Sequence, residues 1–371
     1  MPFPQFDRFT VRMQPLSARE NKKDIIRDHV SPDAEPKQLS RKAQALISEC
    51  GDRVRKARQQ DRPVIVAFGA HAIKNGLAPV FLRLIEGGWV THLATNGAGI
   101  IHDWEFAFQG KSCEDVALMV REGRFGNWEE TGFYINLALN VGAYEGKGYG
   151  ESIGALIQDE GLTIPSTDEL ERFIRNETAK QPESTAGAAD LLGVLQRFDL
   201  PSGRLDIPHP WKKFSIQAGA YRHGVPFTGH PMIGHDIIYN HPMNCCASLG
   251  RAAQRDFLTF AESVSRLDGG VYISVGSAIM SPMIFEKSLS MAQNLAIQSG
   301  EHIDNHFILV NDLVESTWDW SQGEPPEENP DYYLRYNKTF SRMGGRMQYL
   351  GADNRDFLLA LSRQLTAEAK V

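Results

Sequence analysis

Two stretches in the first third of the chain place a short apolar run directly before a glycine-containing loop and a helical pattern. The first is RPVIVAFGAHAIKNGLAPVFLRLIEGGW, from residue 62, and the second is VTHLATNGAGIIHDWE, from residue 90. This order is typical of the βα unit of a parallel, doubly wound sheet. We therefore predict an α/β fold in which ligands bind beyond the carboxyl ends of the strands, near Gly69 and Gly97.

The remaining segments predict one domain with additions. Residues 1 to 35 are polar and are expected to form an extended arm, whereas residues 36 to 60 have the apolar spacing of an amphipathic helix. Residues 105 to 205 are expected to be a variable helical insertion, with an irregular excursion around AKQPESTAGAAD. Further strands are expected at Val225 to Thr228, at Val271 to Val275 and within HIDNHFILVNDL, and a closing helix at RDFLLALSRQL. We predict a single domain over residues 36 to 371, with a Rossmann-like, mostly parallel sheet.

Composition narrows the classes of partner and compartment. A net charge of -7 without a dense basic block outside the N-terminal region does not attract nucleic acid. The chain has no apolar run of about 18 residues, and its start lacks the apolar run of a signal peptide. We expect a cytoplasmic protein that binds neither nucleic acid nor membrane. The cysteines lack zinc-ligand spacing and are expected to be small buried residues: Cys50, Cys113, Cys245 and Cys246.

Two glycine-containing loops are candidates for binding a cofactor. They are GAHAIKNG, residues 69 to 76, and TNGAGIIHD, residues 95 to 103. Glycines let backbone amides approach phosphate, and a following helix N-terminus favours anions. Neither loop is a G-x-G-x-x-G motif, so tight packing turns remain the alternative.

Histidines are concentrated in one part of the sequence. Five of the eleven lie within 33 residues: His209, His223, His230, His235 and His241. Asp236 could be a carboxylate partner of a metal there, but no H-E-x-x-H or H-x-H pair is present. A loop that lines a polar pocket with imidazoles for proton transfer is favoured over a metal site, and we predict no metal.

The segment TWDWSQGEPPEENPDYYLRYNK, residues 317 to 338, is rich in aromatic rings and carboxylates. This composition can enclose a cationic amine, and a solvated acidic loop is the alternative. Its last residue, Lys338, is nucleophilic only if burial or a nearby cation keeps its amine neutral. Otherwise Lys338 is an ordinary surface lysine.

Taken in order, these segments resemble deoxyhypusine synthase, an NAD-dependent, Rossmann-like enzyme that usually forms a homotetramer. The resemblance runs from about Arg62 to the last helix and is interrupted at residues 105 to 205. It rests on VAFGAHAIKNGLAPVFLRLIEGGWV, LATNGAGIIHD, RHGVPFTGHPMIGHDII, VYISVGSAIMSPMIFEKSL and NPDYYLRYNK. The resemblance implies NAD as cofactor and a deoxyhypusine synthase-like NAD-binding fold.

The resemblance also implies roles for individual residues. Lys338 falls on the lysine that forms an imine, and Asp236 falls on an aspartate that binds the substrate amine. The other expected substrate contacts are aromatic: Trp318, Trp320, Tyr332 and Tyr336. The expected NAD contacts are Gly69, Ala70, His71, Thr95, Asn96, Gly97, Gly99 and Asp353.

Several acidic positions of the family are changed in this chain. Ile101 and His102 stand where the family has two glutamates, Pro231 replaces an aspartate, and Tyr332 replaces an acid. The family histidine falls at Ser281 or Pro282, so we expect His102 or His235 to perform the acid–base step. Because each lost charge-assisted hydrogen bond costs roughly 1.5–3 kcal/mol, spermidine is not the expected substrate.

Three functions follow from these features. The first is an NAD-dependent aminoalkyl transferase, similar to deoxyhypusine or homospermidine synthase, that forms an imine on Lys338. Its substrate would be a small amine, a guanidine or an amino acid, and the protein would be a homotetramer. The second is an NAD-dependent amine oxidoreductase or lyase that releases its imine to water. The third is a non-catalytic NAD-binding relative.

Overall fold

A six-stranded parallel sheet forms the centre of the computed structural model, which describes residues 3–37 and 39–367. The strand order is β10-β9-β8-β2-β3-β7. In chain order the strands are β2 (Val64–Phe68), β3 (His92–Asn96), β7 (Phe227–His230), β8 (Val271–Val275), β9 (Phe307–Asp312) and β10 (Arg346–Gly351). Every ladder of this sheet is parallel, which confirms the predicted α/β fold class.

Helices cover both faces of the sheet, because alternate side chains of each strand point to opposite sides. In β2, Val66 belongs to one apolar cluster and Ala67 to another. The first cluster includes residues of α2 (Arg41–Gln59), α4 (Ala78–Glu86) and α15 (Asn354–Ala367). The second includes residues of α12 (Cys246–Ser265), α13 (Met280–Gln298) and α14 (Arg335–Ser341). The sheet is therefore doubly wound.

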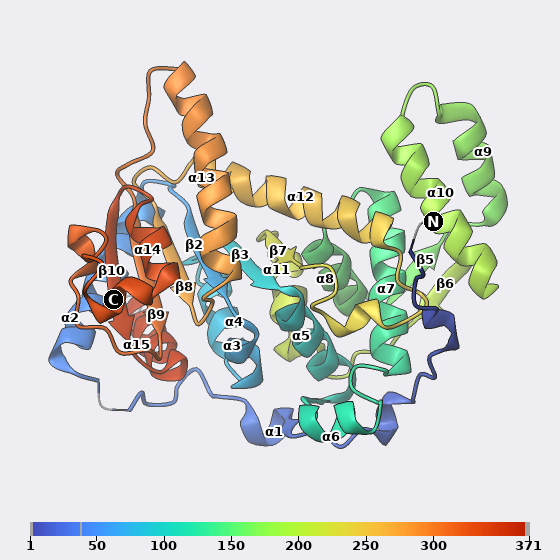
Figure 1. Cartoon of the computed structure of the whole chain (residues 1–371), viewed down its shortest axis with the longest axis horizontal. Helices are drawn as coiled ribbons and strands as arrows, with labels where there is room; N and C mark the ends of the chain where they lie inside the picture. The colour runs from blue at the N-terminus through green and yellow to red at the C-terminus, as the bar shows by residue number, and fades with distance from the viewer. Residues whose placement is uncertain (1–2, 38, 368–371) are drawn as a thin grey trace.

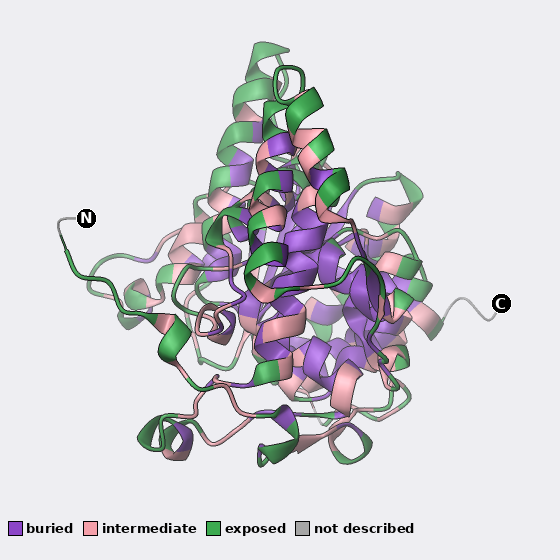
Figure 2. Cartoon of the chain, turned by 90° about the vertical axis from the view of Figure 1, so that its right-hand side faces the viewer, coloured by how far each residue is buried: buried purple, intermediate pink, exposed green. Residues whose placement is uncertain are grey.

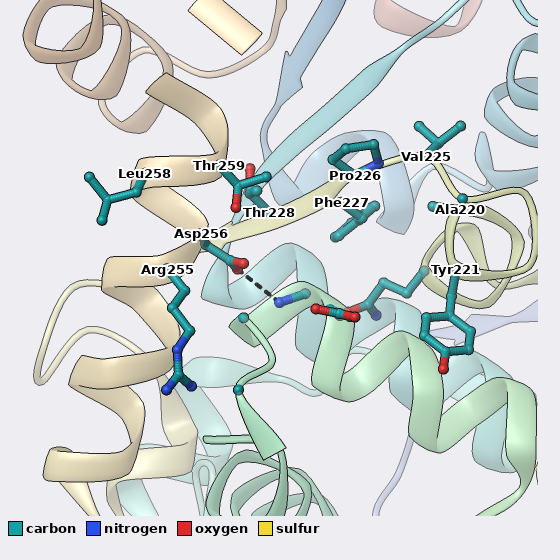
Figure 3. Close-up of a pocket in the computed structure, with 16 residues that line it drawn as sticks. Ala220, Tyr221, Val225, Pro226, Phe227, Thr228, Arg255, Asp256, Leu258 and Thr259 are labelled. Atoms are coloured by element: carbon teal, nitrogen blue, oxygen red, sulfur yellow. Dashed lines mark hydrogen bonds between the residues drawn. The ribbon is translucent and has the colours of Figure 1, made fainter. Parts of the chain in front are cut away.

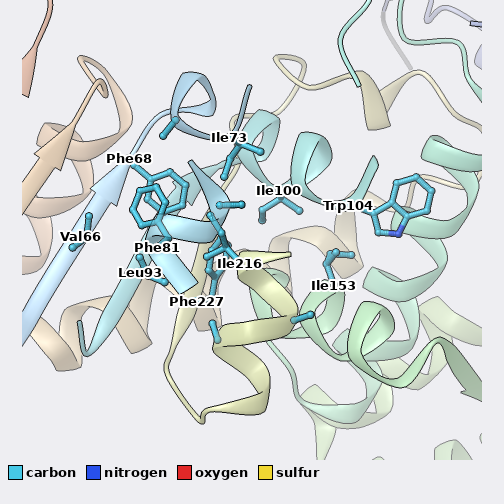
Figure 4. Close-up of a cluster of buried hydrophobic side chains, with 14 of the residues drawn as sticks. Val66, Phe68, Ile73, Phe81, Leu93, Ile100, Trp104, Ile153, Ile216 and Phe227 are labelled. Carbon is cyan, nitrogen blue, oxygen red and sulfur yellow. The ribbon is translucent and has the colours of Figure 1, made fainter. Parts of the chain in front are cut away.

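Helices between β3 and β7 extend the molecule beyond the sheet edge at β7 (Figure 1). They are α5 (Gly97–Gln109), α6 (Val116–Arg121), α7 (Glu129–Glu145), α8 (Tyr149–Asp159), α9 (Thr167–Glu177), α10 (Pro182–Phe198) and α11 (Ile216–Arg222). An antiparallel pair, β5 (Gly161–Ile164) and β6 (Gly203–Asp206), joins the base of the α9–α10 hairpin. The apolar cluster is continuous from Phe68 on the sheet to Trp104 on α5 and Ile153 on α8 (Figure 4).

The N-terminal segment lies along the helices of the same chain. From residue 3 onward it contains only short elements: η1 (Arg8–Thr10), η2 (Leu16–Ala18), β1 (Lys23–Asp24) and α1 (Ile25–Asp28). β1 pairs antiparallel with β4 (Lys111–Ser112), which follows α5. The remaining short elements are α3 (Ala70–Lys74), η3 (Lys212–Phe214), η4 (Ile237–Tyr239), η5 (Trp320–Gln322) and η6 (Pro330–Tyr333).

Four details differ from the sequence prediction. The strand expected at 225–228 is β7, which begins at Phe227, because Pro226 has no N–H to donate to a ladder. The expected excursion at 179–190 is helical from Pro182, which occupies the first turn of α10. β10 was not predicted. Of the cysteines, Cys50 and Cys113 are buried as expected, whereas Cys245 is half-buried and Cys246 is exposed.

Figure 2 shows the buried residues gathered in the interior behind the exposed outer helices. Within the described part of the chain, no helix combines the length and the apolar character needed to cross a bilayer.

Candidate functional site

The chain reverses its direction along the sheet between β2 and β8, and parallel sheets bind ligands at such a point. Gly69 follows β2 and Gly276 follows β8, and the two turns are in backbone contact. A Cβ on Gly69 would lie 2.3 Å from the Gly276 carbonyl oxygen, and Gly276 has φ of +55°. Helix α13 begins four residues after Gly276, and Ser277 Oγ accepts the Ser281 amide of its first turn at 3.2 Å.

The loop after β3 is packed tightly against the protein. The Asn96 side chain accepts a hydrogen bond from the Gly99 amide at 3.0 Å and so caps α5. The Thr95 hydroxyl donates to the Phe68 carbonyl at 2.8 Å. A Cβ on Gly97 would lie 2.1 Å from Asp236 Oδ2, and a Cβ on Gly99 would lie 2.2 Å from Thr95 Oγ1. Close contacts within the chain therefore explain both glycines.

The other residues that the sequence assigned to NAD lie at the same edge of the sheet. Ala70 is half-buried and His71 is exposed, both on α3 after β2. Asp353 follows β10, is exposed, and accepts a hydrogen bond from the Arg355 amide at 2.8 Å. β10 is three strands from β2 in the sheet, which is roughly 14 Å at ordinary strand spacing.

A cavity of about 180 Å³ opens beside this loop. It brings together three of the predicted site residues, His102 on α5 and His235 and Asp236 after β7. Its other titratable side chains come from the N-terminal segment, from α3, from α5 and from the segment after α5: Arg19, Lys74, Glu105, Cys113 and Glu114. We refer to it as the Asp236 cavity.

Asp236 has a carboxyl group in an unusual environment. Its Oδ2 atom is buried and has no hydrogen-bond partner among the described residues. Burial raises the pKa of this carboxyl from 3.8 to about 7. Asp236 can therefore hold or release a proton near neutral pH, which is a property of functional sites.

His102 is fixed in one tautomer by a chain of hydrogen bonds. Ser112 Oγ lies 2.5 Å from Glu105 Oε2 and 2.7 Å from His102 Nδ1. Because a carboxylate only accepts, the Ser112 hydroxyl donates to Glu105 and accepts from His102 Nδ1–H. Nε2 is left with its lone pair. Burial lowers the pKa of His102 to about 4, so the ring is neutral at neutral pH.

A buried ion pair keeps Glu105 ionised. Arg19 donates to both carboxylate oxygens, at 2.7 and 2.8 Å, and both side chains are almost fully buried. The Thr131 hydroxyl donates to the same carboxylate at 3.0 Å. Burial opposes ionisation, but Arg19 outweighs it and lowers the pKa of Glu105.

Lys338 lies outside this cavity, on α14. Its Nζ is 3.0 Å from Glu324 Oε1 and 3.1 Å from the centre of the Tyr332 ring. Burial opposes the charge, but Tyr332 and Glu324 outweigh it and raise the pKa of Lys338. The side chain is thus a protonated ammonium, and among the described residues no hydrogen bond or ion pair joins this group to the Asp236 cavity.

The aromatic residues predicted beside Lys338 are engaged in packing. Trp320 is 2% exposed, and its indole N–H donates to Ser316 at 2.8 Å. The Trp318 indole N–H donates to the Gly323 carbonyl at 2.8 Å. The Tyr336 hydroxyl is 3.4 Å from that of Tyr349. Asp331 organises the segment by accepting hydrogen bonds from Ser316, Thr317 and Trp318.

A larger hollow of about 560 Å³ lies at the amino end of β7 (Figure 3). Two of its charged side chains form hydrogen bonds with backbone groups. Asp256 accepts the amides of Gly150 and Gly229 at 2.9 and 2.6 Å. Arg255 donates to two carbonyls, at 2.9 and 3.2 Å. We assign this hollow a structural role, because Arg255 holds the end of α7 and the loop after it, and Asp256 joins the start of α8 to β7.

The described residues contain no group of three or more histidine, cysteine, aspartate or glutamate side chains that could hold a metal ion.

Sequence reasoning missed the partners of His102. Glu105 could have been found, because it is three residues after His102 and therefore on the same helix face. Arg19 is 86 residues from its partner Glu105, and no sequence pattern links the two.

No family model and no curated protein matches the chain. Among solved structures, it is similar to ArgZ, an arginine dihydrolase from cyanobacteria, with a TM-score of 0.42 and 14% identity over 89% of this chain. It spans about a third of that protein, 32%. A provisionally assigned LOR/SDH protein from Methanococcus maripaludis S2 has a TM-score of 0.45 and 12% identity, over 92% of this chain and 74% of that one. A provisionally assigned deoxyhypusine synthase from Entamoeba histolytica has a TM-score of 0.38 and 10% identity, over 87% and 89%. TM-scores and identities this low carry no functional argument, so the function has to be inferred from the residues of this chain.

Proposed function

We propose that the protein is an NAD-dependent oxidoreductase or lyase that oxidises a small nitrogen-containing substrate in the Asp236 cavity. The observation that carries this proposal is the partnerless carboxyl of Asp236 at the carboxyl edge of a doubly wound parallel sheet. A buried carboxylate without a partner is costly, and a substrate ammonium would supply the missing partner.

The residues at the switch point fit NAD on two observations. Gly69 and Gly276 bring the turns after β2 and β8 together without an intervening side chain, and such glycine turns let the backbone approach a pyrophosphate. Apolar side chains also project from the loops after β7, β8 and β9, where a ring system could pack: Ile233, Ile279 and Leu313 are 73%, 65% and 68% exposed. The residues proposed to hold NAD are Gly69, Ala70, His71, Thr95, Asn96, Gly97, Gly99 and Asp353. When bound, NAD supplies a hydride acceptor for the carbon that carries nitrogen.

The side chains of the cavity have separate roles in this proposal. Asp236 binds the substrate ammonium and orients the carbon beside it. His102 Nε2, whose lone pair is free, accepts the proton that leaves the nitrogen. His235 is exposed and lies at the cavity wall, where it can pass that proton to solvent.

An aminoalkyl transferase that works through an imine on Lys338 is the second candidate. It is supported by the position of Lys338 in its motif and by the low exposure of its side chain, 14%. It requires that Lys338 lose its proton and separate from Glu324, because only a neutral amine is a nucleophile. The ion pair therefore favours the oxidoreductase.

Self-association is proposed from the exposed apolar side chains of one helix. Met283, Met291 and Leu295 on α13 are 42%, 43% and 64% exposed, and their spacing places them on one face. A second copy would bury them, and a homotetramer would be seen as a fourfold mass by light scattering. A monomer at micromolar concentration would contradict this proposal.

The function is tested with purified protein, NAD and a panel of amines, guanidines and amino acids. We expect NADH to accumulate with one class of substrate, in the parent and in Lys338→Met alike. His102→Gln should lower kcat by roughly 10²-fold or more, because it removes the proton acceptor. A mass adduct on Lys338 after borohydride treatment, without net NADH, would indicate the transferase. NAD binding without either product would indicate a non-catalytic relative, and absence of NAD binding would overturn the proposal.

A further inference from the structure

The charges that line the Asp236 cavity do not all pair with one another. Arg19 and Glu105 neutralise each other through two hydrogen bonds. Glu114 accepts the Trp128 indole N–H at 3.0 Å and the Gly126 amide at 3.3 Å. Among the described residues of the lining, Lys74 is the cation without a partner, and Asp236 is the acid whose Oδ2 accepts no hydrogen bond; Glu114 keeps its bonds to neutral donors.

Lys74 has no hydrogen-bond or ion-pair partner within residues 3–37 and 39–367. It lies at the end of α3, is half-buried and lines the cavity. It is also close enough to His102 and Cys113 that its charge adds to the burial that lowers the pKa of His102 and opposes the burial that raises the pKa of Cys113. A half-buried ammonium beside an apolar wall is available to an anion that enters the cavity.

The two groups come from different parts of the sheet. Lys74 follows β2, and Asp236 follows β7, with β3 between these strands. Both side chains line the same cavity, so one small molecule inside it can reach both. The cavity of about 180 Å³ is smaller than the clefts that enclose drug-sized ligands, which begin near 300 Å³. A dinucleotide does not fit there, whereas a molecule of a few carbon atoms does.

We infer that the Asp236 cavity binds an amino acid, with Lys74 paired to its carboxylate and Asp236 to its ammonium. This inference rests on the proposed function for the identity of the site and narrows its substrate class. A simple amine would leave Lys74 without a partner, and a simple acid would place a carboxylate near Asp236. Only a ligand that carries both charges satisfies both groups.

Binding is measured directly, without turnover, in the presence and absence of NAD. The proteinogenic L-amino acids, ornithine and citrulline are screened for an upward shift of the melting temperature. For the best ligand, calorimetry then compares the amino acid with the amine that lacks its carboxylate and with the acid that lacks every amino group. We expect the amino acid to bind about tenfold or more tightly than either analogue, because each loses a charge-assisted contact.

Two variants separate the two contacts. Lys74→Met should weaken binding of the amino acid and of the acid by about tenfold or more and leave the amine unaffected. Asp236→Asn should weaken binding of the amino acid and of the amine and leave the acid unaffected. Lys56→Met, an exposed lysine on α2, is the matched control and should change none of the three.

The inference is overturned if no amino acid of the screen binds, or if the amine binds as tightly as the amino acid. Equal losses for all three ligands in Lys74→Met would also overturn it, since they would indicate a disturbed cavity rather than a lost carboxylate contact. Its failure is distinct from failure of the proposed function. Turnover of amines alone would refute this inference and leave the oxidoreductase, whereas tight amino acid binding without NADH formation would do the reverse.

Discussion

Three aspartates of this protein have buried carboxyl oxygens and differ in how these oxygens are hydrogen-bonded. Asp103 accepts hydrogen bonds from the Ser215 hydroxyl at 2.6 Å, the Ile216 amide at 3.0 Å and other donors. Asp256 accepts two backbone amides. The Oδ2 of Asp236 has no partner within the described residues. Hydrogen bonds therefore offset part of the cost of burial for the first two carboxyl groups, whereas Asp236 Oδ2 has none until a ligand supplies one.

The first prediction at this scale is that Asp236→Asn stabilises the ligand-free protein above about pH 7. Burial raises the folded pKa of Asp236 to about 7, above its ordinary value of 3.8. The folded state therefore holds a proton that the unfolded state releases, and stability is lost as pH rises through this range. Asparagine has no charge to bury. The variant should gain about 1–3 kcal/mol above pH ~7 and nothing below pH ~4, measured by urea titration.

Asp256→Asn is the matched control. Burial also raises the pKa of Asp256 to about 7, but this carboxyl accepts the amides that close the start of α8. Asparagine has an NH2 donor in place of one carboxylate oxygen, and this donor would face backbone N–H donors. We therefore expect Asp256→Asn to give no gain in stability at any pH. If Asp236→Asn were instead destabilising at high pH, Asp236 would have a structural role.

At the scale of elements, the central strands and the edge strand β7 could be predicted, whereas the other edge strand, β10, could not. β2, β8 and β9 are continuous apolar runs because both faces of a central parallel strand are covered. β10 mixes exposed, half-buried and buried positions at the sheet edge and gives no such run. The glycines at positions 97 and 99 were visible in the sequence, but the atoms that they face come from other segments, and Asp236 is 139 positions beyond Gly97.

The second prediction concerns the start of α5, where Gly97 faces Asp236. Gly97→Ala would place its Cβ 2.1 Å from Asp236 Oδ2 and so displace the carboxyl. Because this oxygen has no hydrogen bond to lose, we expect a stability change within ~1 kcal/mol. Ligand affinity, measured by calorimetry, should fall about tenfold or more, since the ammonium contact is lost.

Gly99→Ala, two residues later, provides the contrast. Its Cβ would lie 2.2 Å from Thr95 Oγ1, whose hydrogen bond to Phe68 is buried. This variant should lose stability by roughly 1–3 kcal/mol. If both variants lost stability equally and kept their affinity, the Gly97 contact would be packing alone.

Across the whole molecule, three parts of the chain meet at the cavity. The sheet contributes the loop after β7, the helical additions contribute His102 and Glu105, and the N-terminal segment contributes Arg19. That segment is anchored along its length. The Leu16 amide donates to Glu130 at 2.6 Å, Lys22 pairs with Asp115 at 2.7 Å, and Arg8 binds Asn244. Arg19 is the buried contact of this series, so the segment and the site are coupled through one ion pair.

The third prediction is that Arg19→Met destabilises the protein by roughly 3–5 kcal/mol at neutral pH, because it leaves Glu105 buried without a counter-charge. Arg19 holds the folded pKa of Glu105 below its ordinary value, so this stabilisation is present above pH ~4.5 and is lost as pH falls through the folded pKa. The deficit of the variant should therefore narrow in acid. Arg19→Met combined with Glu105→Gln should recover much of the loss, since no charge then remains buried. Urea titrations across this pH range give the stabilities, and amide hydrogen exchange shows whether residues 3 to 35 open first. A cost below ~1 kcal/mol for the single variant, or no recovery in the double variant, would show that the Arg19–Glu105 ion pair does not couple the N-terminal segment to the site.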